Sequence, residues 1–151
     1  MEAKNRTLKW DKRFLSMADF VSVWSKDPST KVGAVTTDSL NRVLGVGYNG
    51  FPRGVTDFPA WYNDRKEKYP RVVHAEANAI LNSTGSLTGA TIYCSHFPCS
   101  SCAGLIIQSG IISVVSYVPE GEFADRFKDS FNISENMFNH AGVSYWLYDK
   151  D

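Results

Sequence analysis

The chain has 151 residues, with 16 Lys and Arg against 16 Asp and Glu, so its formal net charge is zero. This length predicts a single domain over residues 1–151, because domains usually span about 100–200 residues. The 43% of hydrophobic residues exclude a disordered chain, and no apolar run is long enough to cross a membrane. Zero charge argues weakly against a binder of nucleic acid polymers. With no secretory signal in the sequence, we expect a cytoplasmic protein. In such a protein the three cysteines are expected to bind metal or take part in catalysis rather than to form disulfides.

The pattern of apolar residues and chain breakers predicts helices and strands that alternate in the second half of the chain. The predicted elements are a helix at 11–26, strands at 31–37 and 42–48, a long breaker-rich connection at 49–71, a helix at 74–82, a strand at 90–95, a helix at 99–109, a strand at 111–118, a looser helix at 122–140 and a strand at 143–148. This order predicts an α/β fold with a partly parallel sheet and helices on both faces.

Two short motifs carry the chemistry of a metal site. Cys99 and Cys102 lie three residues apart at the start of a predicted helix, so their sulfurs share one face, and a helix N-terminus favours the thiolate form that binds zinc. By itself this spacing leaves metal binding, redox chemistry and coincidence open. His74 begins the preceding predicted helix and supplies a third ligand. Three protein ligands leave a fourth position for water, which is typical of catalytic rather than structural zinc sites.

Glu76 is the candidate acid and base of this site. Residues two apart on a helix point about 200° away from each other, so Glu76 and His74 share a centre only if that centre lies off the helix end. A carboxylate beside a zinc-bound water can move its protons. Taken alone, Glu76 is better explained as a first-turn residue favoured by the helix dipole. Together with His74 and the two cysteines, it indicates catalysis.

The pattern His74-x-Glu76 followed by Pro98-Cys99-x-x-Cys102 resembles the signature of the zinc-dependent cytidine deaminase superfamily. Further segments are similar to the deoxycytidylate (dCMP) deaminase branch, and the similarity runs from about residue 10 to residue 148. The segments that carry it are Lys26–Ala34, Gly47–Pro52, His74–Ile80 and Phe97–Ala103. The resemblance implies a three-layer α-β-α fold with a mixed five-stranded sheet.

The resemblance also implies the reaction. His74, Cys99 and Cys102 would bind one catalytic Zn²⁺ per subunit, while Glu76 would move protons as water attacks C4 of the cytosine. The substrate would be dCMP, and the products would be ammonia and dUMP, which is the precursor for thymidylate synthesis. No nucleic acid polymer and no membrane would take part.

The family pattern suggests contacts for the base and sugar. The backbone N–H of Ala75 would contact the pyrimidine carbonyl, and Asn49 takes the position of a sugar-binding asparagine. From sequence alone Asn49 is equally well a turn residue before Gly50. Tyr117 lies in a region that closes over the base in relatives, so it would stack there or be buried in its strand.

A nucleoside monophosphate also needs phosphate donors, because burying a dianion without them is unfavourable. We expect Lys31 to serve, with the hydroxyls of Ser29 and Thr30, since these residues precede the first strand near the pocket. A second basic cluster at residues 65–71 is interpreted as a solvated face.

Enzymes of this branch are typically homohexamers that dCTP activates and dTTP inhibits, each with Mg²⁺. The resemblance places the effector site on the Gly-Tyr-Asn-Gly-x-Pro loop, with Asn49, Gly50, Phe51 and Arg53 as contacts.

Two residues depart from the family pattern. Cys94 is predicted to be a buried small hydrophobic residue. His96 either makes a local hydrogen bond or lines the pocket.

Other functions remain open on the sequence. A relative could act on free cytidine, a pterin or riboflavin precursor, or tRNA adenosine, although the last would be expected to show a basic surplus. An alternative of a different class is a non-catalytic zinc-binding interaction module, which would need a fourth protein ligand and no Glu76.

Overall fold

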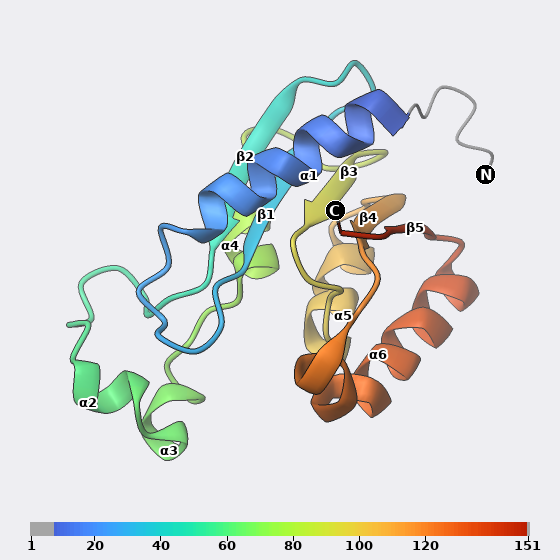
Figure 1. Cartoon of the computed structure of the whole chain (residues 1–151). Coiled ribbons are helices and arrows are strands. Elements are labelled where there is room, and N and C mark those ends of the chain that lie inside the picture. Colours follow the sequence, from blue (N-terminus) through green and yellow to red (C-terminus); the bar gives the residue numbers. More distant parts are fainter. Residues whose placement is uncertain (1–7, 151) are drawn as a thin grey trace.

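The structure is a computed structural model that describes residues 8–150. Over this range the elements are α1 (Leu8–Ser22), β1 (Gly33–Thr37), β2 (Val43–Tyr48), α2 (Pro59–Tyr62), α3 (Arg65–Lys68), α4 (Ala75–Asn82), β3 (Thr91–Cys94), α5 (Ser100–Gln108), β4 (Ser113–Tyr117), α6 (Gly121–Ala141) and β5 (Ser144–Tyr148) (Figure 1). Every element predicted from the sequence is present, and α2 and α3 are additions. Across the described residues, each helix falls short of the length or the hydrophobicity that a membrane span requires.

The strands form one mixed sheet in the spatial order β2-β1-β3-β4-β5. β1 pairs antiparallel with both β2 and β3, whereas β3, β4 and β5 run parallel to one another. Parallel neighbours need a crossover connection, and α5 and α6 supply the two crossovers. The predicted α/β class with a mixed five-stranded sheet is therefore confirmed.

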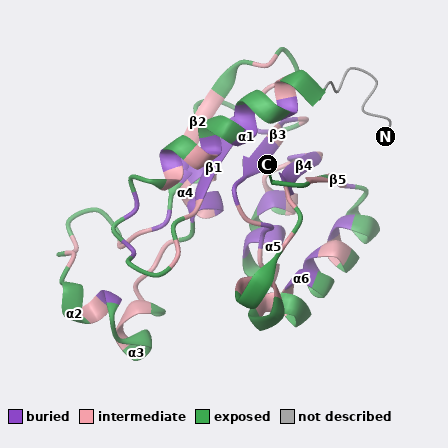
Figure 2. Cartoon of the chain, in the orientation of Figure 1, coloured by how far each residue is buried: buried purple, intermediate pink, exposed green. Residues whose placement is uncertain are grey.

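Helices cover both faces of the sheet, but unequally. On one face α1 packs alone, and its Phe14 and Leu15 share a core cluster with Val35 and Val115. On the other face α4, α5 and α6 enclose the larger cluster, which includes Ile92 of β3. In Figure 1 α1 passes in front of β1, and Figure 2 shows the buried residues running along the strands and the inner sides of the helices. This is the three-layer α-β-α arrangement that the resemblance implied.

A glycine in β2 seats α4 directly on the sheet. A Cβ atom on Gly47 would collide with the Ala75 carbonyl oxygen and the Ala79 backbone nitrogen in α4. Any larger residue at position 47 would push α4 outward. The first residues of α4 belong to the site described below, so this close approach sets how far those residues lie from the sheet.

The two ends of the connection between β2 and α4 are joined by backbone hydrogen bonds. Gly50 and Val73 exchange two backbone hydrogen bonds, of 3.1 and 2.8 Å, so residues 51–72 leave and return at one point, directly before His74. Inside this loop Phe51 stacks on Tyr62 with ring centroids 3.9 Å apart. α2 and α3 have four residues each, which is too short for helical periodicity to be recognised in the sequence.

Candidate metal centre and substrate cavity

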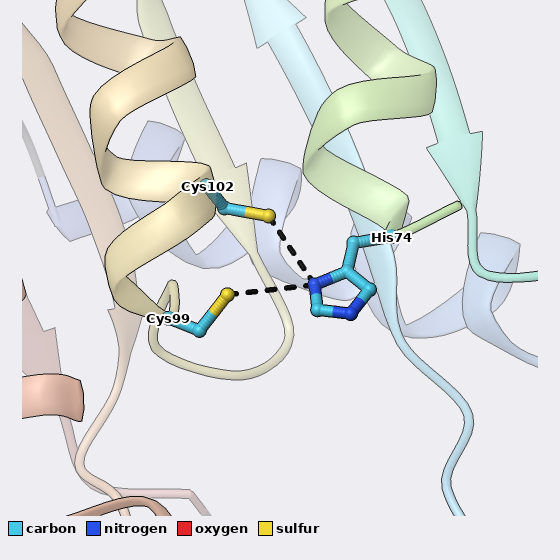
Figure 3. Close-up of side chains that lie close together, drawn as sticks. All are labelled: His74, Cys99 and Cys102. Atoms are coloured by element: carbon cyan, nitrogen blue, oxygen red, sulfur yellow. Dashed lines mark hydrogen bonds between the residues drawn. The ribbon is translucent and has the colours of Figure 1, made fainter. Parts of the chain in front are cut away.

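Three potential metal ligands meet where α4 and α5 begin. His74 is the N-cap of α4 and Cys99 is the N-cap of α5, while Cys102 lies in the first turn of α5. Figure 3 shows both sulfurs directed at the His74 ring from the neighbouring helix. Nδ1 of His74 lies 3.5 Å from Sγ of Cys99 and 3.4 Å from Sγ of Cys102.

The spacing of these atoms fits zinc. The ligand atoms of all three residues lie within 4.8 Å of one another. Tetrahedral zinc, with bonds of about 2.1 Å to nitrogen and 2.3 Å to sulfur, places those atoms roughly 3.5 Å apart. Among residues 8–150 the cluster has these three members, which leaves one coordination position for water.

The environment favours a thiolate. A hydrogen bond from Cys102 lowers the pKa of the Cys99 thiol to about 4, with a further contribution from His74, and the same bond raises the pKa of Cys102. The hydrogen bond to Cys99 raises the pKa of His74. Both cysteines lie where the α5 dipole is positive, which further favours the anionic sulfur that zinc binds.

Helix α6 holds the cysteine turn in place. The Ser130 hydroxyl accepts a 2.8 Å hydrogen bond from the Ser100 N–H, and the Ser134 hydroxyl donates one of 2.8 Å to the Pro98 carbonyl oxygen. Ser134 is fully buried. The sequence does not predict a role for these two serines, because nothing in their spacing links them to the cysteine motif about 30 residues upstream.

Glu76 is buried in the first turn of α4, with 4% of its surface exposed. Burial raises the pKa of Glu76 to about 7, although Cys102 and His74 act in the opposite direction. A carboxyl group with this pKa can take up and release a proton near neutrality. Burial beside His74 and Cys102 is unusual for a first-turn glutamate that merely caps a helix.

Glu76 and His74 line a cavity of about 680 Å³. Its walls come from the segment before β1, from the loop that contains α3, from the starts of α4 and α5, and from α6. The predicted contacts on these walls are Ser29, Thr30, Asn49, Ala75 and Cys99. A cavity of this size accommodates a small ligand such as a nucleotide.

Asn49 is part of a buried polar network. Its side-chain oxygen accepts a 2.9 Å hydrogen bond from the Val32 N–H, while its side-chain nitrogen donates to the Thr30 carbonyl at 2.9 Å and to Asp27 Oδ2 at 3.4 Å. The sequence-based alternative of a simple turn asparagine therefore does not describe this residue. Burial alone would raise the pKa of Asp27. The hydrogen bonds that its carboxylate accepts from Lys68 and from the Ser29 and Thr30 N–H groups instead hold the pKa below its ordinary value of 3.8.

Two residues predicted to contact substrate lie elsewhere. The Lys31 ammonium donates to the Ser25 carbonyl oxygen and does not line the cavity, because this backbone acceptor directs it away. The Tyr117 hydroxyl donates a 2.7 Å hydrogen bond to Asp19, which is on α1. Tyr117 therefore belongs to the α1 face of the sheet rather than to the cavity, which agrees with packing in its strand and not with the alternative of stacking over the base.

Other residues take these places. Arg65 and Lys68, assigned to a solvated face in the sequence, both line the cavity, as does Arg126. Phe123 and Phe127 of α6 form an aromatic wall, with ring centroids 4.8 Å apart. Two sequence features could have identified these residues. Arg65 and Lys68 are three residues apart and Phe123 and Phe127 are four apart, so each pair shares one face of a helix, but the spacing does not tell whether that face meets a ligand.

The residues expected at an effector site divide into two groups. Asn49 lines the cavity, whereas Gly50, Phe51 and Arg53 do not. Gly50 and Phe51 lie at the base of the loop described above, and the Arg53 guanidinium donates to the Asn82 side chain at 3.2 Å.

The two departures from the family pattern are also placed. Cys94 is completely buried in the larger core cluster, so its predicted packing role is confirmed. His96 lines the cavity, and its ring packs against that of Phe123 at a tilt of 44°, with ring centroids 4.6 Å apart. Burial lowers the pKa of His96, so the ring faces the cavity as neutral imidazole.

Similarity to known proteins covers most of the chain. A family model described as the cytidine and deoxycytidylate deaminase zinc-binding region matches residues 8–118. An uncharacterized deaminase from the luxG 3' region of Aliivibrio fischeri is 49% identical, over 92% of this chain and 94% of that protein. Human deoxycytidylate deaminase is 38% identical, over 91% of this chain and 79% of that protein.

Solved structures show the same fold. The dCMP deaminase of the cyanophage S-TIM5, solved with dCMP and dUMP, matches with a TM-score of 0.76 and 24% identity, over 95% of this chain and 100% of that one. The site geometry and the sequence similarities agree, and the chain belongs to the cytidine and deoxycytidylate deaminase family.

Proposed function

We propose that this protein hydrolyses dCMP to dUMP and ammonia. The observation that carries the proposal is one cavity that joins a His-Cys-Cys cluster and a buried glutamate to cationic side chains. The first two features suit deamination of a cytosine ring, and the cations suit a substrate that bears a phosphate. Relatives that are named deoxycytidylate deaminases support the choice of base and sugar.

At the base end, His74, Cys99 and Cys102 would hold zinc, which would supply a water molecule with a pKa lowered towards neutrality. Glu76 would take a proton from the attacking water and deliver it to N3 of the cytosine as the C4–O bond forms. Glu76 would then take the proton of the new C4 hydroxyl and pass it to the exocyclic amine, so that the C4–N4 bond breaks, ammonia leaves and the C4 carbonyl forms.

Backbone groups of α4 orient the base. The first N–H groups of a helix have no partner within the helix, so the Ala75 N–H is available for the pyrimidine carbonyl oxygen. On the opposite wall, both N–H donors of Asn49 are used by Thr30 and Asp27, so its side-chain oxygen accepts a hydrogen bond from a sugar hydroxyl. Phe127 provides a flat apolar surface beside them.

At the phosphate end, Arg65 and Arg126 replace Lys31 as the donors. Both side chains are exposed at the cavity, one on α3 and one on α6, so a phosphate between them remains close to solvent. Ser29 and Thr30 line the same cavity, and the Thr30 hydroxyl can add a neutral hydrogen bond, whereas the Ser29 hydroxyl already donates to Asp27 Oδ1 at 3.0 Å. An arginine pair suits a phosphate dianion because each guanidinium can donate two parallel hydrogen bonds.

The proposal extends to regulation and assembly. We propose activation by dCTP and inhibition by dTTP, each with Mg²⁺, through the segment from Asn49 to Arg53, because Asn49 joins that segment to the cavity. We also propose a homohexamer. The exposed apolar side chains of Phe20, Val23 and Trp24 on and beyond α1 support assembly, since apolar patches of this kind mark contacts between subunits.

A substrate panel tests the proposal. Ammonia release is measured for dCMP, CMP, deoxycytidine and dCTP, with and without dTTP and Mg²⁺, and light scattering gives the oligomeric state. We expect kcat/KM to be highest for dCMP. Preference for deoxycytidine would contradict the monophosphate assignment, whereas dCMP activity that ignores dTTP would contradict only the regulation.

A further inference from the structure

A lysine and an aspartate form a buried ion pair in the cavity wall. Nζ of Lys68 lies 2.9 Å from Oδ1 and 2.8 Å from Oδ2 of Asp27. The side chains are 12% and 2% exposed, so solvent screens the pair little. The residues come from α3 and from the segment between α1 and β1, and both line the cavity.

The ammonium group of Lys68 is held by Asp27 and Ser29. Nζ donates hydrogen bonds to Asp27 Oδ1 at 2.9 Å and to the Ser29 hydroxyl at 2.8 Å, and it forms an ion pair with Asp27 Oδ2 at 2.8 Å. Two of the three donors of the ammonium and its charge are therefore directed at this wall. Lys68 is therefore poorly placed to bind a phosphate directly, unlike Arg65 and Arg126.

Asp27 in turn organises the neighbouring wall. Oδ1 accepts hydrogen bonds from the Ser29 N–H at 2.9 Å and the Thr30 N–H at 3.2 Å, which fixes the turn before β1. Oδ2 accepts from the side-chain nitrogen of Asn49. The carboxylate is thus built into the substrate wall, and without a counter-charge it would place a negative charge beside an anionic ligand.

We propose that Lys68 is a positioning residue that determines specificity for the monophosphate by neutralising Asp27. Asp27 shapes the wall that holds Ser29 and Asn49, and Lys68 cancels the charge of that carboxylate so that the cavity accepts a phosphate dianion. The inference rests on the proposed function, since it requires a phosphate-bearing substrate. It differs from a direct phosphate contact because the charge of Asp27, rather than a donor on Lys68, decides the outcome.

The experiment compares charge variants on two substrates. Lys68→Met leaves Asp27 uncompensated, and the double variant Asp27→Asn with Lys68→Met removes both charges while Oδ1 of the new amide still accepts from Ser29 and Thr30. Lys66→Met, on the exposed side of the same short helix, is the matched control for loss of one positive charge. Steady-state KM and kcat are measured with dCMP and with deoxycytidine, and zinc content and thermal unfolding are measured for every variant.

Lys68→Met is expected to raise KM for dCMP about tenfold, the effect of roughly one uncompensated charge, while kcat/KM for deoxycytidine changes less than about threefold. The double variant is expected to recover most of the loss with dCMP, and Lys66→Met to match the wild type. Equal losses on both substrates would overturn the inference in favour of a structural role. A double variant that keeps its activity on deoxycytidine but is as poor as Lys68→Met with dCMP would also overturn it, in favour of direct phosphate binding. A wild type without preference for dCMP would overturn the proposed function and this inference with it.

Discussion

His74 and Glu76 show how two residues of one short motif reach the same cavity. His74 has extended backbone angles, φ −70° and ψ 156°, because it is the N-cap and not the first helical residue of α4. The 200° separation expected for two positions on a helix therefore does not apply, and the two side chains meet off the helix end. Cys99 has the same N-cap geometry in α5, with φ −69° and ψ 169°.

At the same scale, Asp27 predicts how stability depends on pH. Its pKa is lowered in the folded protein, so its contribution to the free energy of unfolding is present above pH 3.8 and is lost as the pH falls below that value. At pH 7 we expect Asp27→Asn to cost about 3 kcal/mol, as breaking a buried ion pair does. Urea unfolding of wild type and variant at several pH values measures the difference, which should shrink below pH 3.8. A difference that is the same at pH 7 and pH 3 would contradict this account.

At the scale of elements, the starts of α4 and α5 form the metal centre, and β2 and α6 hold these helices in place. α6 is linked to the cysteine turn through Ser130 and Ser134. β2 seats α4 through Gly47, whose added Cβ would collide with the α4 backbone. The chemistry of the site thus depends on elements that contribute no ligand to it.

Gly47→Ala tests the seat of α4. We expect the variant to lower the free energy of unfolding by about 1–3 kcal/mol, because the new methyl group overpacks against backbone atoms that cannot rotate away. Gly104→Ala in α5 is the matched control. A Cβ there meets no atom within 4 Å, so this variant should stabilise the protein by about 0.5–1 kcal/mol through helix propensity. Denaturant unfolding measures both, and equal effects of the two substitutions would count against the close approach of α4 to β2.

At the scale of the whole molecule, most of the fold follows from local patterns. The continuous apolar run before Pro119 gave a buried strand, and Pro98 and Gly110 marked the ends of α5. The convergence of His74 with Cys99 and Cys102 was also foreseen, since the motif spacing places them at adjacent helix starts. What the sequence could not provide was the path of the long loop, because one-turn helices leave no periodic signal. That loop brings Arg65 and Lys68 to the wall of the cavity.

The other failures have the same physical origin. Lys31 and Tyr117 lie close in sequence to the cavity walls, but their side chains bond elsewhere. Lys31 donates to the Ser25 carbonyl oxygen, and Tyr117 donates to the Asp19 carboxylate. Such acceptors come from other segments, so single-sequence patterns do not reveal them. The residue pattern of β4 also did not reveal on which face Tyr117 lies, since both faces of this strand are covered.

The central claim is that Glu76 moves the proton in a zinc-dependent deamination of dCMP. Its most direct test is ammonia release from dCMP by the wild type and by Glu76→Gln, with zinc content measured on the same samples. The account predicts one zinc per chain in both proteins and a loss of kcat of at least about a hundredfold in the variant, the usual scale of general acid and base catalysis. A Glu76→Gln protein that keeps both its zinc and its ammonia release would contradict the mechanism.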